Sequence, residues 1–148
     1  MTPLERFLPY AADFEKTLVD DDWARLTPYF AEDSVYLVES DRFGAELTGP
    51  DAIFAGMKKS LDGFDRVFES RDVRPSDPEI EDDSLEVDWS IIYHKPGLPD
   101  FVLEGRSRVE YRDGVIARLV DSYDEAATNQ ALAAWTADTG IQLDPSYT

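Results

Sequence analysis

The segment Leu103–Asp124 constrains the fold of this chain more than any other. It contains two runs of alternating apolar and polar residues, separated by Asp113-Gly114. A two-residue turn of type I′ needs a positive φ at both central positions, and Asp-Gly is one of the pairs that adopts it readily. The pattern therefore predicts two long antiparallel strands that are joined by a tight hairpin.

The alternation of residue types assigns the two faces of these strands. Over 85–93 and 101–111 the odd-numbered residues are apolar or small, whereas most even-numbered residues are polar. Because successive side chains of a strand point to opposite faces, only the odd set can be buried. In the last strand Arg118 favours solvent, so we expect Asp121 to point inward. A one-residue bulge would reverse this assignment.

Helices are expected in the first 63 residues. Thr2–Glu5 has the pattern of a capping box with proline at the first helical position, and apolar residues follow at helical spacing as far as Leu18. A short second helix is predicted to begin at Trp23. A third is predicted to begin at Gly49-Pro50 and to end near Gly63.

Strands and one further helix are expected elsewhere. Strands are predicted over 34–39, 66–74 and 85–93, and a helix over 125–139. The acidic run 77–83 contains a proline and no periodicity, which predicts a loop. Helices followed by a run of antiparallel strands indicate an α+β fold, with helices on one face of a curved sheet. The length of 148 residues fits a single domain, 1–148.

The net charge of −18 limits the partners that this chain can have. Nucleic acids and anionic membranes require a basic surface, and no run of about 20 apolar residues is present to span a bilayer. The N-terminus lacks the basic and apolar regions of a secretory signal. We therefore expect a cytoplasmic protein that binds neither nucleic acid nor membrane. The absence of cysteine excludes disulfides and thiolate metal sites.

Five segments, in this order, carry a resemblance to a known family. They are Asp22–Leu26, Phe30–Val35, Gly49–Ile53, Arg112–Ile116 and Asp121–Asp124. Together they resemble the nuclear transport factor 2-like superfamily, in particular its SnoaL-like branch, over about residues 4–126. The resemblance implies a cone in which three N-terminal helices and a strongly bent antiparallel sheet enclose a pocket. Residues 127–148 would add a C-terminal helix and tail.

Two catalytic patterns of this superfamily are missing from the chain. The ketosteroid isomerases of this fold use a tyrosine on the first helix and an aspartate on the first strand, and these positions resemble Phe14 and Val38. The scytalone dehydratase-like enzymes use a Tyr-Asp pair before the tryptophan of the second helix, and this pair falls on Leu18 and Val19. Both mechanisms are therefore expected to be absent.

A third pattern is present in part. Epoxide hydrolases of the limonene type use an Asp-Arg-Asp arrangement, whose last aspartate resembles Asp121. The other two members belong on an earlier strand, where this chain has Trp89, Ile91 and Tyr93. SnoaL-like cyclases also use an acid in the pocket. The resemblance thus implies a role for Asp121 and for no second catalytic group.

Asp121 is accordingly the candidate catalytic residue. A carboxyl group in an apolar pocket has a raised pKa, which suits a general acid or base. Three roles stay open for it: catalysis, ligand contact, or a structural acid that a tyrosine, an arginine such as Arg71 or the backbone satisfies. The pocket wall is expected to include Phe14, Trp23, Tyr36, Phe54, Met57, Trp89, Tyr93, Leu119 and Tyr123.

The expected function follows from these residues. The pocket should bind a small hydrophobic molecule, with cofactor-free acid–base catalysis of the isomerase, cyclase or hydrolase type, in which Tyr36 or Tyr93 donates a hydrogen bond. The alternative is a non-catalytic ligand-binding or dimeric scaffold domain, and the lack of a second catalytic group favours it. His94, the only histidine, lies on the charged face and makes a weak case for a metal site.

A homodimer is expected through the outer face of the sheet. The charged row Glu104, Arg106, Arg108 and Glu110 lies on that face and would pair with its copy across a two-fold axis. Ile92 and Val102 would add apolar contacts on the same face.

The net charge leads to a prediction about salt. Because repulsion among like charges weakens the folded state, screening should stabilise it. We expect the melting temperature to rise as sodium chloride increases from about 10 to 300 mM, measured by circular dichroism. A flat or falling curve would show that attractive ion pairs dominate.

Overall fold

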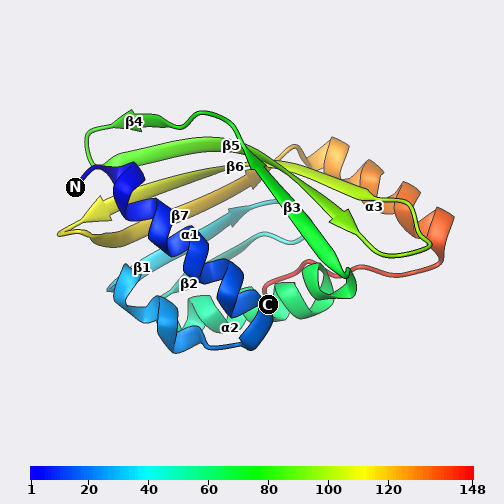
Figure 1. Ribbon diagram of the computed structural model, residues 1–148, viewed down its shortest axis with the longest axis horizontal. Coiled ribbons are helices and arrows are strands. Elements are labelled where there is room, and N and C mark those ends of the chain that lie inside the picture. Colours follow the sequence, from blue (N-terminus) through cyan, green and yellow to red (C-terminus); the bar gives the residue numbers. More distant parts are fainter.

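A computed structural model describes residues 1–148 as helices packed on one side of a single curved sheet (Figure 1). The elements are α1 (Pro3–Asp20), the 3₁₀ helix η1 (Trp23–Tyr29), β1 (Phe30–Glu39), β2 (Ala45–Thr48), α2 (Pro50–Gly63), the 3₁₀ turn η2 (Asp65–Val67), β3 (Ser70–Pro75), β4 (Glu79–Glu81), β5 (Ser84–His94), β6 (Phe101–Arg112), β7 (Val115–Tyr123) and α3 (Glu125–Thr139). The α+β class is confirmed.

The sheet is mixed, and not wholly antiparallel as predicted. Its order is β2-β1-β7-β6-β5-β3, and β4 pairs with the first part of β5. The first strand, β1, runs parallel to β7, while every other pair is antiparallel. Parallel pairing needs a long connection between the two strands. Here the connection is residues 40–114, from β2 to β6 and about half of the chain, so local patterns could not reveal it.

The predicted hairpin between β6 and β7 is confirmed. Arg112 pairs with Val115, and the turn residues Asp113 and Gly114 have φ values of 52° and 81°. A bulge follows, because Glu110 pairs with Arg118 while the next residue pairs with Ile116. The extra residue lies before Asp121. It turns Ile116 inward while Arg118 keeps its outward position, so the predicted inward face from residue 119 onward is preserved.

The odd-numbered face of β5 and β6 is buried, as the alternation predicts. Leu85, Tyr93 and Val109 have at most 2% of their surface exposed. Helices α1 and α2 cover this concave face (Figure 1). The helix α1 begins with the predicted capping box, in which the Glu5 amide donates to Thr2 Oγ1 and the Thr2 amide donates to Glu5 Oε2.

The outer face carries charges that pair within the same chain. Arg106 Nε lies 2.6 Å from Asp88 Oδ1, and Arg106 also lies 3.1 Å from Glu86. Arg108 lies 3.4 Å from Glu86, and Glu110 lies 3.7 Å from both Arg108 and Arg118. These arginines therefore have partners on their own sheet before any second copy approaches.

The predicted short second helix is present as the 3₁₀ helix η1, which contains Pro28. Local predictions failed at three other places, where tertiary pairing decides the structure. The predicted strand 66–74 begins as η2, and its strand starts only at Ser70. The acidic run that predicted a loop includes β4, and β2 was not predicted at all. Short edge strands take their hydrogen bonds from a neighbouring strand, so their own periodicity is weak.

The C-terminal residues belong to the same packed body. Leu132 and Trp135 of α3 are 5% and 4% exposed, and Trp135 Nε1 donates to the carbonyl of Pro99 at 2.8 Å. After α3 the chain runs back along α2 and ends near the middle of the molecule (Figure 1). Leu143 of this last segment is 7% exposed and joins the core. The tail thus completes the core and is more than an appendage to residues 4–126.

Candidate functional site

A cavity of about 210 Å³ lies between the concave face of the sheet and the helices. Of its 26 lining residues, 18 are hydrophobic, so its wall is mainly apolar. Residues of α1, α2, α3, the sheet and the C-terminal segment all contribute to it. A mainly apolar wall with a few polar groups is typical of sites for small molecules.

Most of the residues expected in the pocket wall line this cavity together with Asp121. They are Phe14, Tyr36, Met57, Trp89, Tyr93, Leu119 and Tyr123. Trp23 and Phe54 do not line it. Their rings lie 5.7 Å apart and Phe54 packs on Phe30, so both belong to a neighbouring part of the core. Trp23 is only partly buried there, and its indole N–H donates to Asp21 at 3.1 Å.

Asp121 is held by two hydroxyl groups from neighbouring strands. Tyr36 donates to Asp121 Oδ2 at 2.5 Å, and Ser107 donates to Asp121 Oδ1 at 2.6 Å. Trp89 Nε1 donates to Ser107 Oγ at 2.9 Å. Because an indole N–H can only donate, the Ser107 oxygen accepts from Trp89 and its proton is directed to Asp121. The directions of the hydrogen bonds from Trp89 to Ser107 and from Ser107 to Asp121 are therefore fixed.

The environment of Asp121 favours its neutral form. Burial raises the pKa of its carboxyl, and the hydrogen bonds from Ser107 and Tyr36 oppose the rise. Arg71, a possible counter-ion from the sequence, does not pair with it. Asp121 is half-buried and lines the cavity, so the area that it leaves accessible faces the interior of the cone.

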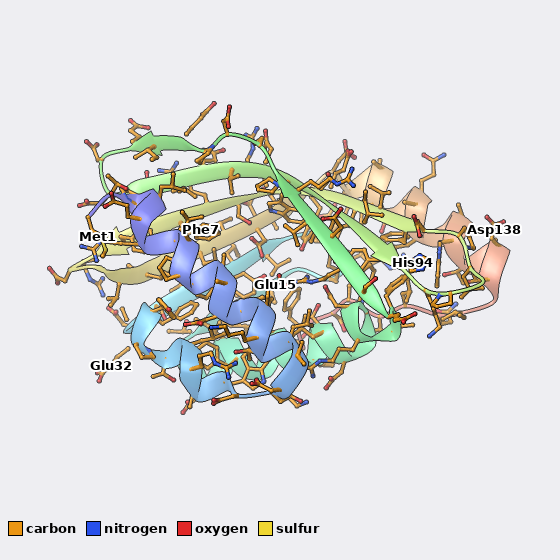
Figure 2. The ribbon with its side chains drawn as sticks, in the orientation of Figure 1. Met1, Phe7, Glu15, Glu32, His94 and Asp138 are labelled. Atoms are coloured by element: carbon orange, nitrogen blue, oxygen red, sulfur yellow. The ribbon has the colours of Figure 1, made fainter.

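A second carboxylate, Asp65, lines the same cavity in a different setting. Arg71 Nη1 lies 2.7 Å from Asp65 Oδ2, and Tyr93 donates to the same oxygen at 3.0 Å. Arg71 also pairs with Glu15 of α1 at 2.6 Å and lies over the ring of Phe14, 5.7 Å from its centroid. Figure 2 labels Glu15 on the helix that faces β3.

Asp65 and Arg71 form an ion pair in which each charge has a direct partner. Burial raises the pKa of Asp65, while the charge of Arg71 and the hydrogen bonds that Asp65 accepts oppose the rise. Burial disfavours the charge of Arg71, but Asp65 and Glu15 together outweigh this and raise its pKa. Sequence reasoning missed Asp65 because η2 is a short turn, in which no periodicity indicates the direction of a side chain.

Tyr10 is another cavity residue that sequence reasoning missed. It lies one helical turn before Phe14, is 6% exposed, and lines the cavity. Tyr36 and Tyr93 donate to carboxylates, whereas the Tyr10 hydroxyl has no hydrogen-bond partner. Burial first, and then the nearby Asp121, raise the pKa of Tyr10. Its three-residue spacing from Phe7 was the signal that could have placed it on the inward face.

The C-terminal segment also reaches the cavity. Tyr147 lines it, and its hydroxyl lies 3.3 Å from that of Tyr36. The two rings meet edge to face, with centroids 5.5 Å apart. No sequence pattern indicated this contact, because residues 140–148 have no regular secondary structure.

Other candidate features lie outside this cavity. His94 pairs with Asp100 at 3.0 Å at the exposed end of β5 (Figure 2). No group of three or more histidine, aspartate or glutamate side chains is arranged to hold a metal ion. None of the helices is both long enough and apolar enough to cross a membrane.

No protein-family model and no curated protein sequence matches this chain. Solved structures do resemble it. A putative isomerase from Bacillus subtilis has a TM-score of 0.67 and 17% identity, covering 97% of this chain and 100% of that one. An LEH-like epoxide hydrolase of M. tuberculosis has a TM-score of 0.59 and 15% identity, covering 90% and 93%.

A third similar structure is an NTF2-like protein. An NTF2-like protein of unknown function from Exiguobacterium sp. 255-15 has a TM-score of 0.60 and 17% identity, covering 83% of this chain and 98% of that one. At these identities the likeness concerns the fold and not the chemistry. The likeness to these structures, with the bent sheet and the helices on its concave face, shows that this chain has the NTF2-like fold, as the order of its sequence segments predicted.

Proposed function

We propose that this protein binds a small, mostly apolar molecule in its cavity and that Asp121 exchanges a proton with it. The observation that carries the proposal is a half-buried carboxyl group that lines an apolar cavity and has only neutral hydrogen-bond donors. A carboxyl group in such a setting has a pKa moved toward neutrality, which suits general acid–base catalysis.

The volume of the cavity limits the size of the ligand. An apolar protein cavity of ~150 Å³ accommodates benzene. The cavity of about 210 Å³ therefore suits a molecule of one or two small rings. The apolar wall supports a ligand whose binding derives mainly from removing hydrocarbon surface from water.

The free hydroxyl of Tyr10 supports a ligand that carries an oxygen atom. Tyr36 and Tyr93, the donors expected from the sequence, are already committed to Asp121 and Asp65. Tyr10 is a buried tyrosine that lines the cavity, and its hydroxyl is not committed to a carboxylate. A carbonyl oxygen that accepts from Tyr10 would be polarised, and the proton on the adjacent carbon would become more acidic. Asp121 in its ionised form would then act as the base.

The similar structures support this class of reaction. One is a putative isomerase and another an epoxide hydrolase, and both types of reaction move protons without redox chemistry. The Asp65–Arg71 ion pair supports a positioning role for Asp65, because Arg71 already neutralises its charge. The alternative is a binding module without turnover, which a measurement of proton exchange separates from an enzyme.

Proton exchange on a model ketone tests the proposed function. We expect wild type to accelerate deuterium exchange at the α-carbon of 1-indanone in D₂O, followed by NMR. Asp121→Asn should lower this rate by about 10²-fold or more, the usual contribution of a general base. Tyr10→Phe should weaken 1-indanone binding by up to about tenfold and leave binding of indane, which lacks the oxygen, unchanged. Binding without exchange would support the non-catalytic module, and no binding of either compound would refute the proposal.

The raised pKa of Asp121 predicts a specific pH dependence of stability. An acid whose pKa is higher in the folded state binds its proton more tightly there, so stability falls as pH rises from the unfolded pKa, about 3.9, to the folded one. In Asp121→Asn the new amide side chain would accept from Ser107 and donate to Tyr36, as the protonated acid does. The difference in unfolding free energy, wild type minus Asp121→Asn, should therefore decrease through that window and then level off. Urea titrations at several pH values measure it, and a constant difference would contradict the assignment.

We also propose that the protein is a homodimer through the outer face of the sheet. The intrachain ion pairs leave this face with few unpaired charges, and Val102 is 47% exposed on it. We expect light scattering to give the mass of a dimer at micromolar concentration, and Val102→Lys to shift it toward monomer. A wild-type monomer under these conditions would refute the dimer.

A further inference from the structure

We propose that Tyr147 is a functional residue of the cavity, and that the C-terminal strap, residues 140–148, sets the size of the ligand and favours the ionised form of Asp121. This inference rests on the proposed function of the same cavity. It assigns a specificity-determining and positioning role to a segment that neither the motifs nor the fold resemblance indicated.

The strap is seated on α2 by polar contacts along its length. The Asp144 amide donates to the carbonyl of Gly63 at 3.0 Å, and Ser60 Oγ donates to the carbonyl of Pro145 at 2.7 Å. Lys59 Nζ donates to Ser146 Oγ at 2.7 Å. Leu143 anchors the start of the segment in the core. The position of Tyr147 is thus determined by specific contacts.

The last residue of α2 is small where the strap crosses it. A Cβ atom on Gly63 would lie 2.1 Å from the carbonyl oxygen of Asp144, which is well inside van der Waals contact. Gly63 does not have a positive φ, so its own backbone conformation would tolerate alanine. Close approach of the strap is therefore the reason why a side chain does not fit here.

Tyr147 forms part of the cavity wall beside Tyr36. Its ring packs edge to face on that of Tyr36, and Pro145 of the strap lines the cavity with it. A large aromatic side chain at this position excludes ligand volume. Removing it would enlarge the cavity on the side where Tyr36 meets Asp121.

The hydroxyl of Tyr147 acts on Asp121 through Tyr36. Trp89 directs the Ser107 proton to Oδ1 of Asp121, so only the hydrogen bond between Tyr36 and Asp121 can change its direction. When Asp121 is ionised, Tyr36 donates its single hydroxyl proton to it. The Tyr36 oxygen is then left to accept from the Tyr147 hydroxyl, which lies 3.3 Å away. When Asp121 is protonated, the direction of the chain reverses. A donor at Tyr147 therefore strengthens the arrangement in which Asp121 is charged, since hydrogen bonds in a chain polarise one another.

Several groups face Asp121 and define what else influences its ionisation. They are Tyr36 of β1, Ser107 of β6, Tyr10 of α1, Tyr123 of β7 and Tyr147 of the strap. All are neutral at physiological pH. Tyr147 is thus one of a small set of dipoles that oppose the cost of burying this charge.

The first test needs no ligand. The ¹³C-carboxyl resonance of Asp121 is titrated by NMR in wild type, in Tyr147→Phe and in Tyr111→Phe. Tyr111 is a matched control because its buried hydroxyl also lacks a partner, and it does not line the cavity. We expect Tyr147→Phe to move the Asp121 midpoint to higher pH and Tyr111→Phe to leave it unchanged. Equal midpoints in wild type and Tyr147→Phe would overturn the role assigned to the hydroxyl.

The second test measures ligand size. Affinities for 1-indanone and for the larger 9-fluorenone are compared in wild type, Tyr147→Ala and Gly63→Ala. We expect both variants to bind 9-fluorenone about tenfold or more tighter than wild type, a gain of about 1.4 kcal/mol. Gly63→Ala keeps Tyr147 but displaces the strap, so it separates the position of the strap from loss of the ring. If neither variant gains affinity for 9-fluorenone while 1-indanone still binds, the strap does not set ligand size.

The two proposals fail in different ways. If wild type binds neither ketone and shows no proton exchange, the proposed function fails, and the titration still decides whether Tyr147 acts on Asp121. If wild type binds 1-indanone but the Tyr147 and Gly63 variants match it in every measurement, the strap has a structural role only, and the inference is overturned.

Discussion

The register of β7 between its two neighbours is the constraint on which the site depends. This strand pairs in parallel with β1 and antiparallel with β6, and Asp121 lies opposite Val38 on one side and Ser107 on the other. Ser107 therefore meets the carboxylate directly, and Tyr36 reaches it from two residues along β1. A slip of one residue would move Asp121 to the outer face and would place Val120 or Ser122 against the two hydroxyls.

The cavity contains two carboxylates whose surroundings give them different properties. Asp65 faces Arg71, so its charge is neutralised by a permanent cation. Asp121 has hydroxyl partners, which can adapt to either protonation state because an O–H group donates and accepts. Protonation of Asp65 would leave the charge of Arg71 with Glu15 as its remaining partner, whereas the hydroxyls around Asp121 can hydrogen-bond to both of its protonation states. This difference, more than the presence of an acid, singles out Asp121 as the reactive group.

Most charged side chains lie on the surface of the protein and not in its cavity. The net charge of −18 lies mainly on the surface, where arginines pair with acids of neighbouring strands or helix turns. Such exposed pairs contribute little to stability and are screened by salt. The interior is instead dominated by aromatic side chains, and the polar groups around Asp121 are joined by hydrogen bonds. The many surface acids are thus expected to have little effect on the ionisation of Asp121 in the cavity.

Local patterns in the sequence were sufficient to predict the main elements of this protein. The Asp-Gly turn, the capping box of α1 and the parity of β5 and β6 were predictable because each depends on residues close together in the chain. The same parity, with Arg118 outward, was enough to place Asp121 on the inward face. The groups that Asp121 meets could be found only in the folded molecule. Tyr36 is 85 residues away from it, and Tyr147 is 111 residues away from Tyr36. Periodicity reports which face of an element is buried, but it carries no information about which distant side chain lies opposite, since that depends on strand order, register and the path of the C-terminal strap.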